Sequence, residues 1–366
     1  MRVKLEDVCE RGSSNIKQSD IIKMSGNYPI YGASGLAGKV NFYHQKQPYV
    51  AVVKDGAGIG RTTLNPAKSS VIGTMQYLIP KKNVLPEYLF YVVSYMHLEK
   101  YYTGATIPHI YFKDYKNEEF NLDNIEKQLE IIDALGRCKK VIEARKQELV
   151  ELDRLTKARF VEMFGDPIQN PKGWEVVTIG DIVTEVRYGT SKPAVEGGKY
   201  PYLRMNNLTA DGHLDLNDLK YIDIPDDEIE KCVVRKGDVL FNRTNSIELV
   251  GKTAVFDLPE DMIIAGYIIR VRLTEKMLPE VLSQYMNLEA LKGILRGMAK
   301  GAVNQANINA QELQSIKVYI PEMELQKQFV KMKEQIYKSK FDTMTFAPIY
   351  AIINLYLYTY FYQGRR

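Results

Sequence analysis

The sequence contains few of the residues that build disulfide frameworks or metal sites. Cysteine occurs three times in 366 residues, as Cys9, Cys138 and Cys232, and histidine occurs four times. An odd number of distant cysteines forms neither a disulfide framework nor a Cys-x-x-Cys zinc site, and the histidines lack metal-ligand spacing. The chain also opens without the apolar stretch of a signal peptide. We therefore expect a cytoplasmic protein that uses no metal and no cofactor.

Catalytic motifs are missing as well. Gly251, Lys252 and Thr253 resemble the end of a phosphate-binding P-loop, but Ser246 stands where the first glycine of that motif belongs. The glycine-rich residues 54–60 lack a full Gly-x-Gly-x-x-Gly context. The Asn/Asp-Pro-Pro-aromatic tetrapeptide of adenine methyltransferases is absent. These absences favour a protein that binds a partner without catalysing a reaction, so we predict no catalytic residues.

A long internal repeat runs through the chain. Its segments keep the same order at separations of about 170 to 200 residues, and a repeat of this length indicates two similar domains. The matched segments are residues 28–30 and 200–202, 60–62 and 251–253, 85–89 and 278–282, and 125–140 and 325–340.

Each copy of the repeat has the same predicted layout. A stretch rich in β-forming residues and turn signals comes first. A short helix follows each Leu-Pro-Glu, and a long helix comes next. The fold class is therefore α+β. The clearest predicted strands are residues 49–53 and 70–79 in the first copy and residues 238–241 and 263–273 in the second.

The long helix of the first copy has an unusual length. From Leu122 to Met163, apolar residues recur at spacings of three, four and seven, which predicts one helix of about 60 Å. Gly165 and Pro167 end it. Because its other face is charged, we interpret it as a spacer that packs against another helix. A similar helix begins at Pro321.

The charged helical pattern stops after Asp342. Residues 343–364 carry no charge, and Pro348 would interrupt a helix. The apolar residues 346–362 are at the short limit for a membrane span and include Pro348, so we expect no membrane anchor. We interpret residues 343–366 as an atypical tail that has replaced the last part of the helix by frameshift or recombination.

Several motifs, taken in order, resemble those of the specificity subunits of type I restriction-modification systems. Tyr-Pro-Ile-Tyr-Gly at residues 28–32 resembles the Tyr-Pro-Val-Tyr-Gly segment of that family. Residues 160–167, followed by Gly173 and Trp174, resemble the join between the two halves of such a subunit. The resemblance covers about residues 1–341. Its other motifs are the domain openings at residues 4–9 and 178–182, the Gly-Ala stretches at 104–110 and 301–308, and the helix start at 320–328.

This resemblance implies a function and a set of partners. Each target-recognition domain reads one half of a bipartite, asymmetric double-stranded DNA target. The two spacer helices pair as an antiparallel coiled coil and fix the gap between the half-sites. Two modification subunits methylate adenine, and restriction subunits translocate and cleave the DNA. The implied division is residues 1–121 and 166–320 for the two target-recognition domains, 122–165 and 321–342 for the spacer helices, and 343–366 for the tail.

Charge identifies candidate DNA contacts. Residues 11–82 carry ten basic side chains and two acidic ones, an imbalance suited to phosphate binding. The matching stretch of the second copy is rich in aspartate, so its candidates are local clusters of Arg, Asn and Lys in turns. The predicted DNA-binding residues are Tyr31, Ser34, Lys39, Lys54, Arg61, Lys68, Arg187, Thr190, Ser191, Lys192, Arg204, Asn206, Asn207, Arg243, Asn245 and Lys252.

Other function classes stay open at this point. The chain can be the recognition part of a fused restriction enzyme or methyltransferase, and measurable cofactor binding would favour that alternative. It can be a truncated, inactive specificity allele, because its last helix departs from the family pattern. A coiled-coil protein with carbohydrate- or protein-binding heads is a third alternative. Binding to duplex DNA that weakens steeply with salt would exclude it.

Overall fold

The computed structural model describes residues 1–104, 108–302, 305–344 and 357–363. Parts of the two Gly-Ala motifs, residues 105–107 and 303–304, and most of the predicted tail lie outside this range. The chain divides into two compact units. The first domain comprises Met1–Arg145 and Met344–Arg366, and the second comprises Lys146–Thr343.

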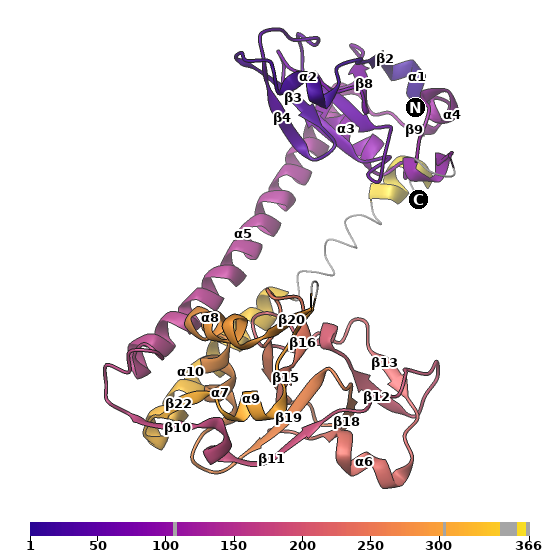
Figure 1. Ribbon diagram of the computed structural model, residues 1–366. Helices are drawn as coiled ribbons and strands as arrows, with labels where there is room; N and C mark the ends of the chain where they lie inside the picture. Colours follow the sequence, from indigo (N-terminus) through magenta and orange to yellow (C-terminus); the bar gives the residue numbers. More distant parts are fainter. Residues whose placement is uncertain (105–107, 303–304, 345–356, 364–366) are drawn as a thin grey trace. The chain divides into compact units, whose positions relative to one another are not determined.

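Mixed helices and strands form both domains (Figure 1). The elements of the first domain are β1 Arg2–Lys4, α1 Leu5–Val8, β2 Cys9–Ser13, α2 Gln18–Ile21, β3 Tyr28–Gly32, β4 Gly35–Val40, β5 Tyr49–Val53, β6 Thr62–Asn65, β7 Ser70–Val71, β8 Met75–Pro80, α3 Pro86–Ser94, η1 Leu98–Tyr101, α4 Phe112–Tyr115, β9 Glu119–Asn121, the start of α5 Ile125–Phe164, and η4 Thr359–Gln363.

The second domain contains the end of α5 and the elements that follow it. These are β10 Glu175–Thr178, η2 Ile179–Ile182, β11 Val183–Tyr188, β12 Tyr200–Leu203, η3 Met205–Asn207, β13 Lys220–Ile222, α6 Asp226–Cys232, β14 Val233–Val234, β15 Val239–Asn242, β16 Thr244–Asn245, β17 Thr253–Val255, β18 Met262–Ile264, β19 Ile268–Leu273, α7 Pro279–Met286, α8 Glu289–Met298, β20 Lys300–Ala302, β21 Gln305–Asn307, α9 Ala310–Gln314, β22 Lys317–Ile320 and α10 Met323–Met344.

The two domains share one sheet topology. The main sheet has the strand order β2-β8-β5-β6 in the first domain and β11-β19-β15-β17 in the second. A second sheet contains the parallel pair β3–β7 in the first domain and β12–β18 in the second. All five residues of β5 are buried, as expected of a central strand that is covered on both faces. The predicted strand at residues 70–79 forms two strands, because residues 73–74 turn the chain.

A buried glutamine stands at the start of each long helix and shows how the two copies align. Gln128 accepts a hydrogen bond from the backbone N–H of Leu85 (2.8 Å), and Gln326 accepts one from that of Leu278 (2.9 Å). Each amide group also donates to two backbone carbonyls near the helix start. The counterpart of Gln128 is therefore Gln326, and the sequence alignment of residues 125–140 with 325–340 is wrong by two residues.

Helix α5 is one continuous element of 40 residues, as predicted (Figure 1). It begins at Ile125 because the Asn124 side chain accepts a hydrogen bond from the Lys127 backbone (2.9 Å) and caps the first turn. In the second domain, Phe160 of α5 stacks edge-on against Phe329 of α10, with ring centres 5.3 Å apart. Further along α10, Lys340 pairs with Asp153, which precedes Phe160. The two helices therefore run antiparallel over this part of the second domain.

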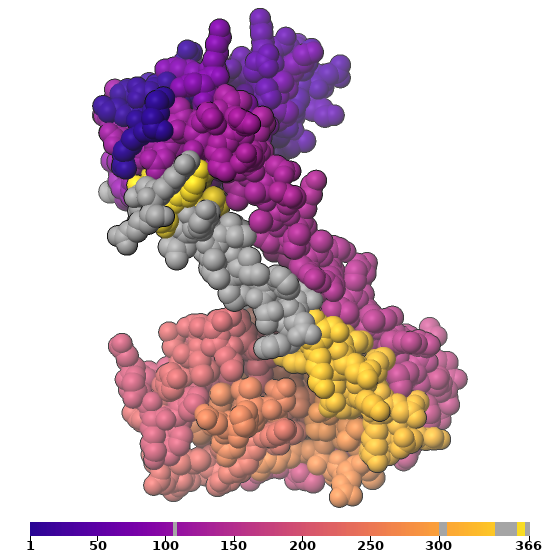
Figure 2. Space-filling view, turned by 180° about the vertical axis from the view of Figure 1, so that it is seen from behind, coloured from indigo at the N-terminus to yellow at the C-terminus, as the bar shows by residue number. Residues whose placement is uncertain are grey.

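The C-terminal segment packs into the core of the first domain. Leu357 and Phe361 are buried, and the Phe361 ring meets Tyr88 edge-on at 5.5 Å. The Tyr362 hydroxyl donates to the carbonyl of Val92 (2.5 Å). Figure 2 shows these yellow residues against the surface of the first domain. Residues 357–362 are therefore part of a folded core, which argues against the interpretation of this region as a foreign tail.

The position of this segment in the repeat supports the same conclusion. Phe160 and Phe164 fill the core of the second domain from the end of α5. Leu357 and Phe361 stand 197 residues after them and fill the core of the first domain. Each domain thus receives apolar side chains at the same place of the shared fold. Among the residues that the structure describes, no helix combines the length and apolar character needed to cross a bilayer.

A buried arginine links the two sheets of the second domain. Arg270 of β19 is 0% exposed and donates to the carbonyl of Val233 in β14. Its Nη2 also donates to Glu185 Oε2 of β11 (2.6 Å), which in turn pairs with Arg272 (3.0 Å). Because a buried charge is tolerated only when it is paired, this network requires both sheets in one arrangement.

As the pH falls into the acid range, we expect the second domain to lose stability. Burial raises the pKa of the Glu185 carboxyl. Three neighbouring guanidinium groups, those of Arg187, Arg270 and Arg272, outweigh this effect and hold that pKa below its usual value. A pKa depressed by folding gives stability that is complete above the unfolded-state pKa and is lost as the pH falls below it. Urea unfolding at neutral pH and in acid measures this loss. The loss should shrink in Glu185→Gln, and an equal loss in that variant would contradict the assignment.

Candidate nucleic-acid interface

Three segments of the first domain converge at the end of strand β5. They are the turn between β3 and β4, the glycine-rich loop after β5, and the segment before α4. Arg61 Nη1 donates to the carbonyl of Ala33 in the turn (3.1 Å). The backbone N–H of Ile110 donates to the carbonyl of Lys54 (3.0 Å). The predicted residues that these contacts bring into one region are Tyr31, Ser34, Lys54 and Arg61.

Aromatic rings border this region. Tyr102 and Tyr111 are 50% and 48% exposed, and the rings of His109 and Tyr111 lie 4.0 Å apart. Lys113 Nζ lies 5.1 Å from the centre of the Tyr111 ring, and His109 pairs with Asp55. Exposed rings beside cations offer stacking to bases and charge to phosphates. Sequence reasoning missed these residues, because the Gly-Ala motif beside them indicated only the family.

Two predicted cations of the first domain lie outside the converging segments. Lys39 is exposed in strand β4, opposite Pro29 of β3. Lys68 is exposed in the turn between β6 and β7, where its φ of 54° is left-handed. No described contact brings either lysine to the converging segments, and their role in DNA binding stays a prediction.

Arg243 is the centre of the corresponding region in the second domain. Its guanidinium carbon lies 4.9 Å from the centre of the Tyr188 ring, and Nη1 approaches the Gly266 carbonyl at 3.5 Å. The Gly266 N–H donates to the carbonyl of Thr190 (2.7 Å), which draws a third segment into the region. Arg243 Nε is buried without a hydrogen-bond partner among the described residues. Tyr188 and Tyr267, 42% and 50% exposed, were not predicted.

Three predicted cations of the second domain are already paired with carboxylates. The pairs are Arg187–Glu185 at 3.0 Å, Lys192–Glu228 at 2.9 Å and Arg204–Asp218 at 2.6 Å. All three are accessible to solvent, where an ion pair contributes at most about 1 kcal/mol. A phosphate can therefore replace the carboxylate at small cost. The other accessible candidates are Ser191, Asn206 and Asn245.

Two predicted residues are buried and serve the fold. The Asn207 side chain accepts from the backbone of Arg204 (2.8 Å) and donates to the carbonyl of Asp215 (2.7 Å). Lys252 Nζ donates to the carbonyls of Met205 (2.8 Å) and Leu208, and burial lowers the pKa of this lysine. We leave Asn207 and Lys252 out of the proposed contact surface, because their polar groups are occupied inside the domain.

Arg61 is the counterpart of Lys252 in the repeat and makes a similar hydrogen bond. Each follows a glycine with a left-handed φ, 79° and 80°, respectively. Each donates to the carbonyl of the loop after the parallel strand, Ala33 in one domain and Met205 in the other. Arg61 therefore links the glycine-rich loop to the turn between β3 and β4, but unlike Lys252 its side chain is exposed, and its role in DNA binding stays a prediction.

Lys54 and Arg243 are the second equivalent pair. Each is the first residue after the central strand, β5 or β15. Each carbonyl accepts a hydrogen bond from an isoleucine N–H of the Gly-Ala segment, Ile110 at 3.0 Å and Ile308 at 2.9 Å. Both domains thus place a cation at the same point of the shared fold. The sequence hides this match, because the loops that follow differ in length.

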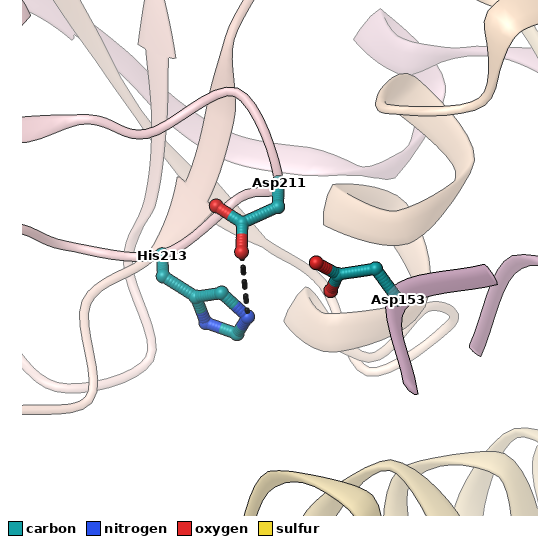
Figure 3. A group of neighbouring side chains, drawn as sticks. All are labelled: Asp153, Asp211 and His213. Atoms are coloured by element: carbon teal, nitrogen blue, oxygen red, sulfur yellow. Dashed lines mark ion pairs between the residues drawn. The ribbon is translucent and has the colours of Figure 1, made fainter. Parts of the chain in front are cut away.

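One side-chain group of the second domain has the composition of a metal site. Ligand atoms of Asp153, Asp211 and His213 lie within 4.8 Å of one another (Figure 3). His213 Nε2 is 3.7 Å from Asp211. However, Lys340 Nζ pairs with both carboxylates, at 3.5 Å from Asp211 and in direct contact with Asp153. Because the ammonium group already supplies the positive charge, we interpret this group as an ion-pair cluster.

Known proteins resemble this chain in both sequence and fold. A protein of Methanocaldococcus jannaschii named as a type I restriction enzyme MjaX specificity subunit is 32% identical over 166 residues, 44% of this chain and 39% of the relative. The type I restriction enzyme EcoKI specificity subunit of Escherichia coli K12 is 29% identical over 160 residues, 43% of this chain and 34% of the relative. These matches therefore span less than half the length of the relatives.

A solved structure shows the same fold over nearly the whole chain. The type I restriction-modification system S subunit from M. genitalium has a TM-score of 0.59 and covers 98% of this chain and 95% of its own, at 14% identity. The family model described as the type I restriction modification DNA specificity domain matches residues 1–154 and again residues 171–349. The chain therefore belongs to the family of type I restriction-modification DNA specificity subunits.

Proposed function

We propose that this chain recognises DNA within a cytoplasmic type I restriction-modification complex and catalyses no reaction itself. Each domain reads one part of a bipartite, asymmetric double-stranded target. Two modification subunits that methylate adenine and restriction subunits that cleave the DNA assemble with it. The observation that supports this proposal most directly is the equivalence of Lys54 and Arg243, each a cation at the end of the central strand and close to exposed aromatic rings.

The chemistry of the two regions suits DNA. A lysine or arginine binds phosphate, and arginine also pairs with guanine through two hydrogen bonds. Arg243 is half-buried, and its Nη1 makes only one long hydrogen bond, 3.5 Å to the Gly266 carbonyl, so the end of the guanidinium keeps donor capacity for a base edge or a phosphate. The neighbouring Tyr188 and Tyr267 add ring surface and hydroxyl groups. The two regions carry different side chains, which agrees with an asymmetric target.

The helices supply the spacing in this proposal. Helix α5 is 40 residues long, which corresponds to about 60 Å at 1.5 Å per residue. We propose that α5 and α10 pair along an antiparallel coiled coil beyond the contacts described above. The pairing then acts as a ruler between the two half-sites.

Methylome sequencing tests the proposed function. The chain is co-expressed with its modification subunit in cells that lack other adenine methylation, and N6-methyladenine is mapped. One new split motif with a fixed gap is the expected result. A soluble complex that adds no methylated motif would contradict the proposal.

Arg243→Ala is expected to weaken binding to the cognate duplex by about 1–3 kcal/mol, or roughly 5- to 150-fold. The loss should be confined to the half-site that the second domain reads if Arg243 pairs with a base. If it pairs with a phosphate, binding should weaken uniformly and the slope of log affinity against log salt should fall by about 1. Fluorescence anisotropy at several salt concentrations distinguishes the two.

Arg235→Ala is the matched control for this experiment. Arg235 is an arginine of the same domain that pairs with Glu230 and Asp261 outside the converging segments. Its removal should leave the affinity within about twofold of the original, since surface ion pairs contribute little. Equal losses in the two variants would show that Arg243 contributes only general charge.

A further inference from the structure

The ion-pair cluster of the second domain joins three separate elements. Asp153 comes from α5, Lys340 from α10, and Asp211 from the loop between η3 and β13. The Lys340 side chain is only 7% exposed, whereas the two carboxylates keep about a third of their surface (34% and 36%). The lysine is therefore the buried member, and its charge depends on these carboxylates for compensation.

The loop that carries Asp211 is a rigid part of the second domain. Thr209 and His213 close it through their backbone and hydroxyl groups, at 2.9 to 3.0 Å. Gly212 has a φ of 86°, and a Cβ there would stand 2.6 Å from the Asn287 side chain. The loop is thus pressed against the end of α7. The ion pairs of Lys340 therefore connect this loop of the recognition domain, through Asp211, to helix α5, through Asp153, and to α10, which carries Lys340.

Among the described residues, Lys340 is the cation that pairs with both carboxylates of the cluster. Burial lowers the pKa of the His213 imidazole, so this ring is neutral at neutral pH. It lies 4.9 Å from the Tyr337 ring of α10 and fills space beside the lysine. Lys333 lines the same hollow, and burial lowers its pKa to about 8. Lys333 therefore still carries a charge at neutral pH, but the burial that lowers its pKa makes further positive charge in this hollow costly.

In the part of the first domain that the structure describes, the position of Lys340 is taken by an apolar residue. The position that corresponds to Lys340 in the repeat, 198 residues earlier, is Ile142 of α5. An apolar residue there cannot pair with a carboxylate. The buried lysine of the cluster is therefore not repeated in the described part of the first domain.

We propose that Lys340, together with Asp153 and Asp211, fixes the direction in which α5 leaves the second domain and thereby sets the gap between the two half-sites. This inference rests on the proposed function. Asp153 lies 28 residues from the start of α5, which corresponds to about 42 Å. A tilt of about 4.6° at Asp153 moves that start by about 3.4 Å, the rise of one base pair. A change of a few degrees at this bridge is therefore enough to change the gap by one base pair.

The test measures how DNA binding depends on the length of the gap between the half-sites. The preference for the half-site sequences serves as an internal reference. The complex with its modification subunit is prepared with the original chain, Lys340→Met and the milder Asp153→Asn. Each is assayed on duplexes that carry both half-sites, identified from the methylome, with the original gap and with gaps one base pair shorter and longer. We expect the preference for the original gap to fall by roughly tenfold in Lys340→Met and by less in Asp153→Asn. Half-site preferences should stay unchanged.

Lys338→Met controls for the loss of a positive charge on the same helix, because Lys338 is exposed. Its gap preference should equal that of the original chain. If both cluster variants melt at lower temperature but keep the original gap preference, the cluster only stabilises the fold and the inference is wrong. If the original chain supports no split motif at all, the proposed function fails first, and the inference falls with it.

Discussion

Arg270→Ala is expected to destabilise the second domain by about 3–5 kcal/mol. Arg270 is among the largest fully buried side chains of the protein, so truncation leaves a cavity between the two sheets. The carbonyl of Val233 loses its donor, and Glu185 loses one of its guanidinium partners. An unsatisfied buried carbonyl and a cavity each lower the free energy of unfolding, and both arise where the two sheets meet.

Hydrogen exchange of the amides in β15 and β19 measures this effect in the full-length chain, because it reports on one domain at a time. Arg235→Ala is the matched control: its arginine has two carboxylate partners but is 40% exposed, so about 1 kcal/mol or less is expected. A loss in Arg270→Ala no greater than in the control would show that the buried network contributes no more than a surface pair.

The first domain has a buried tyrosine at the position of Arg270. Tyr77 of β8 is the counterpart of Arg270 and is 1% exposed. Its hydroxyl accepts a hydrogen bond from the backbone N–H of Val71 (2.9 Å), in the other sheet of the first domain. Both domains therefore place a large side chain with a polar end here, and both use it to join the two sheets.

Phe361→Ala is expected to destabilise the first domain by about 3–5 kcal/mol, the usual cost of removing a buried aromatic ring. Phe361 is 0% exposed and contacts Tyr88, and it shares a core with Leu89 and Val92. Thermal unfolding combined with hydrogen exchange of β5 and β8 measures the change. Tyr358→Ala is the control, because Tyr358 belongs to the same segment but is 36% exposed.

Truncation of the chain after Asp342 tests the role of the C-terminal segment further. It lacks Leu357 and Phe361 and leaves the apolar core of the first domain open, so we expect it to be less soluble than the full chain. If residues 343–366 were a foreign tail, the shortened chain would instead be more soluble and equally stable. Better solubility together with unchanged exchange in β5 would therefore restore the interpretation as a foreign tail.

The sequence by itself determined the large-scale organisation. The repeat predicted two similar domains. The periodic apolar residues predicted one long helix from Leu122 to Met163, and the structure has this helix from Ile125 to Phe164, because a pattern sustained over many turns is a strong signal. Leu-Pro-Glu located α3 and α7, since proline is favoured in the first turn of a helix. The ordered motifs identified the family. These features depend on the spacing of residues along the chain, which can be read directly from the sequence.

Only the tertiary structure decided which side chains serve recognition and which serve the fold. Lys252 and Asn207 look like DNA-binding residues in a polar turn, but both are buried and bonded to backbone carbonyls. The rings of Tyr111 and Tyr188 carry no signal in the sequence, because their exposure depends on segments that are distant along the chain. The uncharged C-terminal segment was interpreted as a foreign tail because its contacts, too, are with segments that are distant along the chain. Its partners lie in the first domain, more than 200 residues earlier, and burial against them is what makes an apolar sequence suitable there.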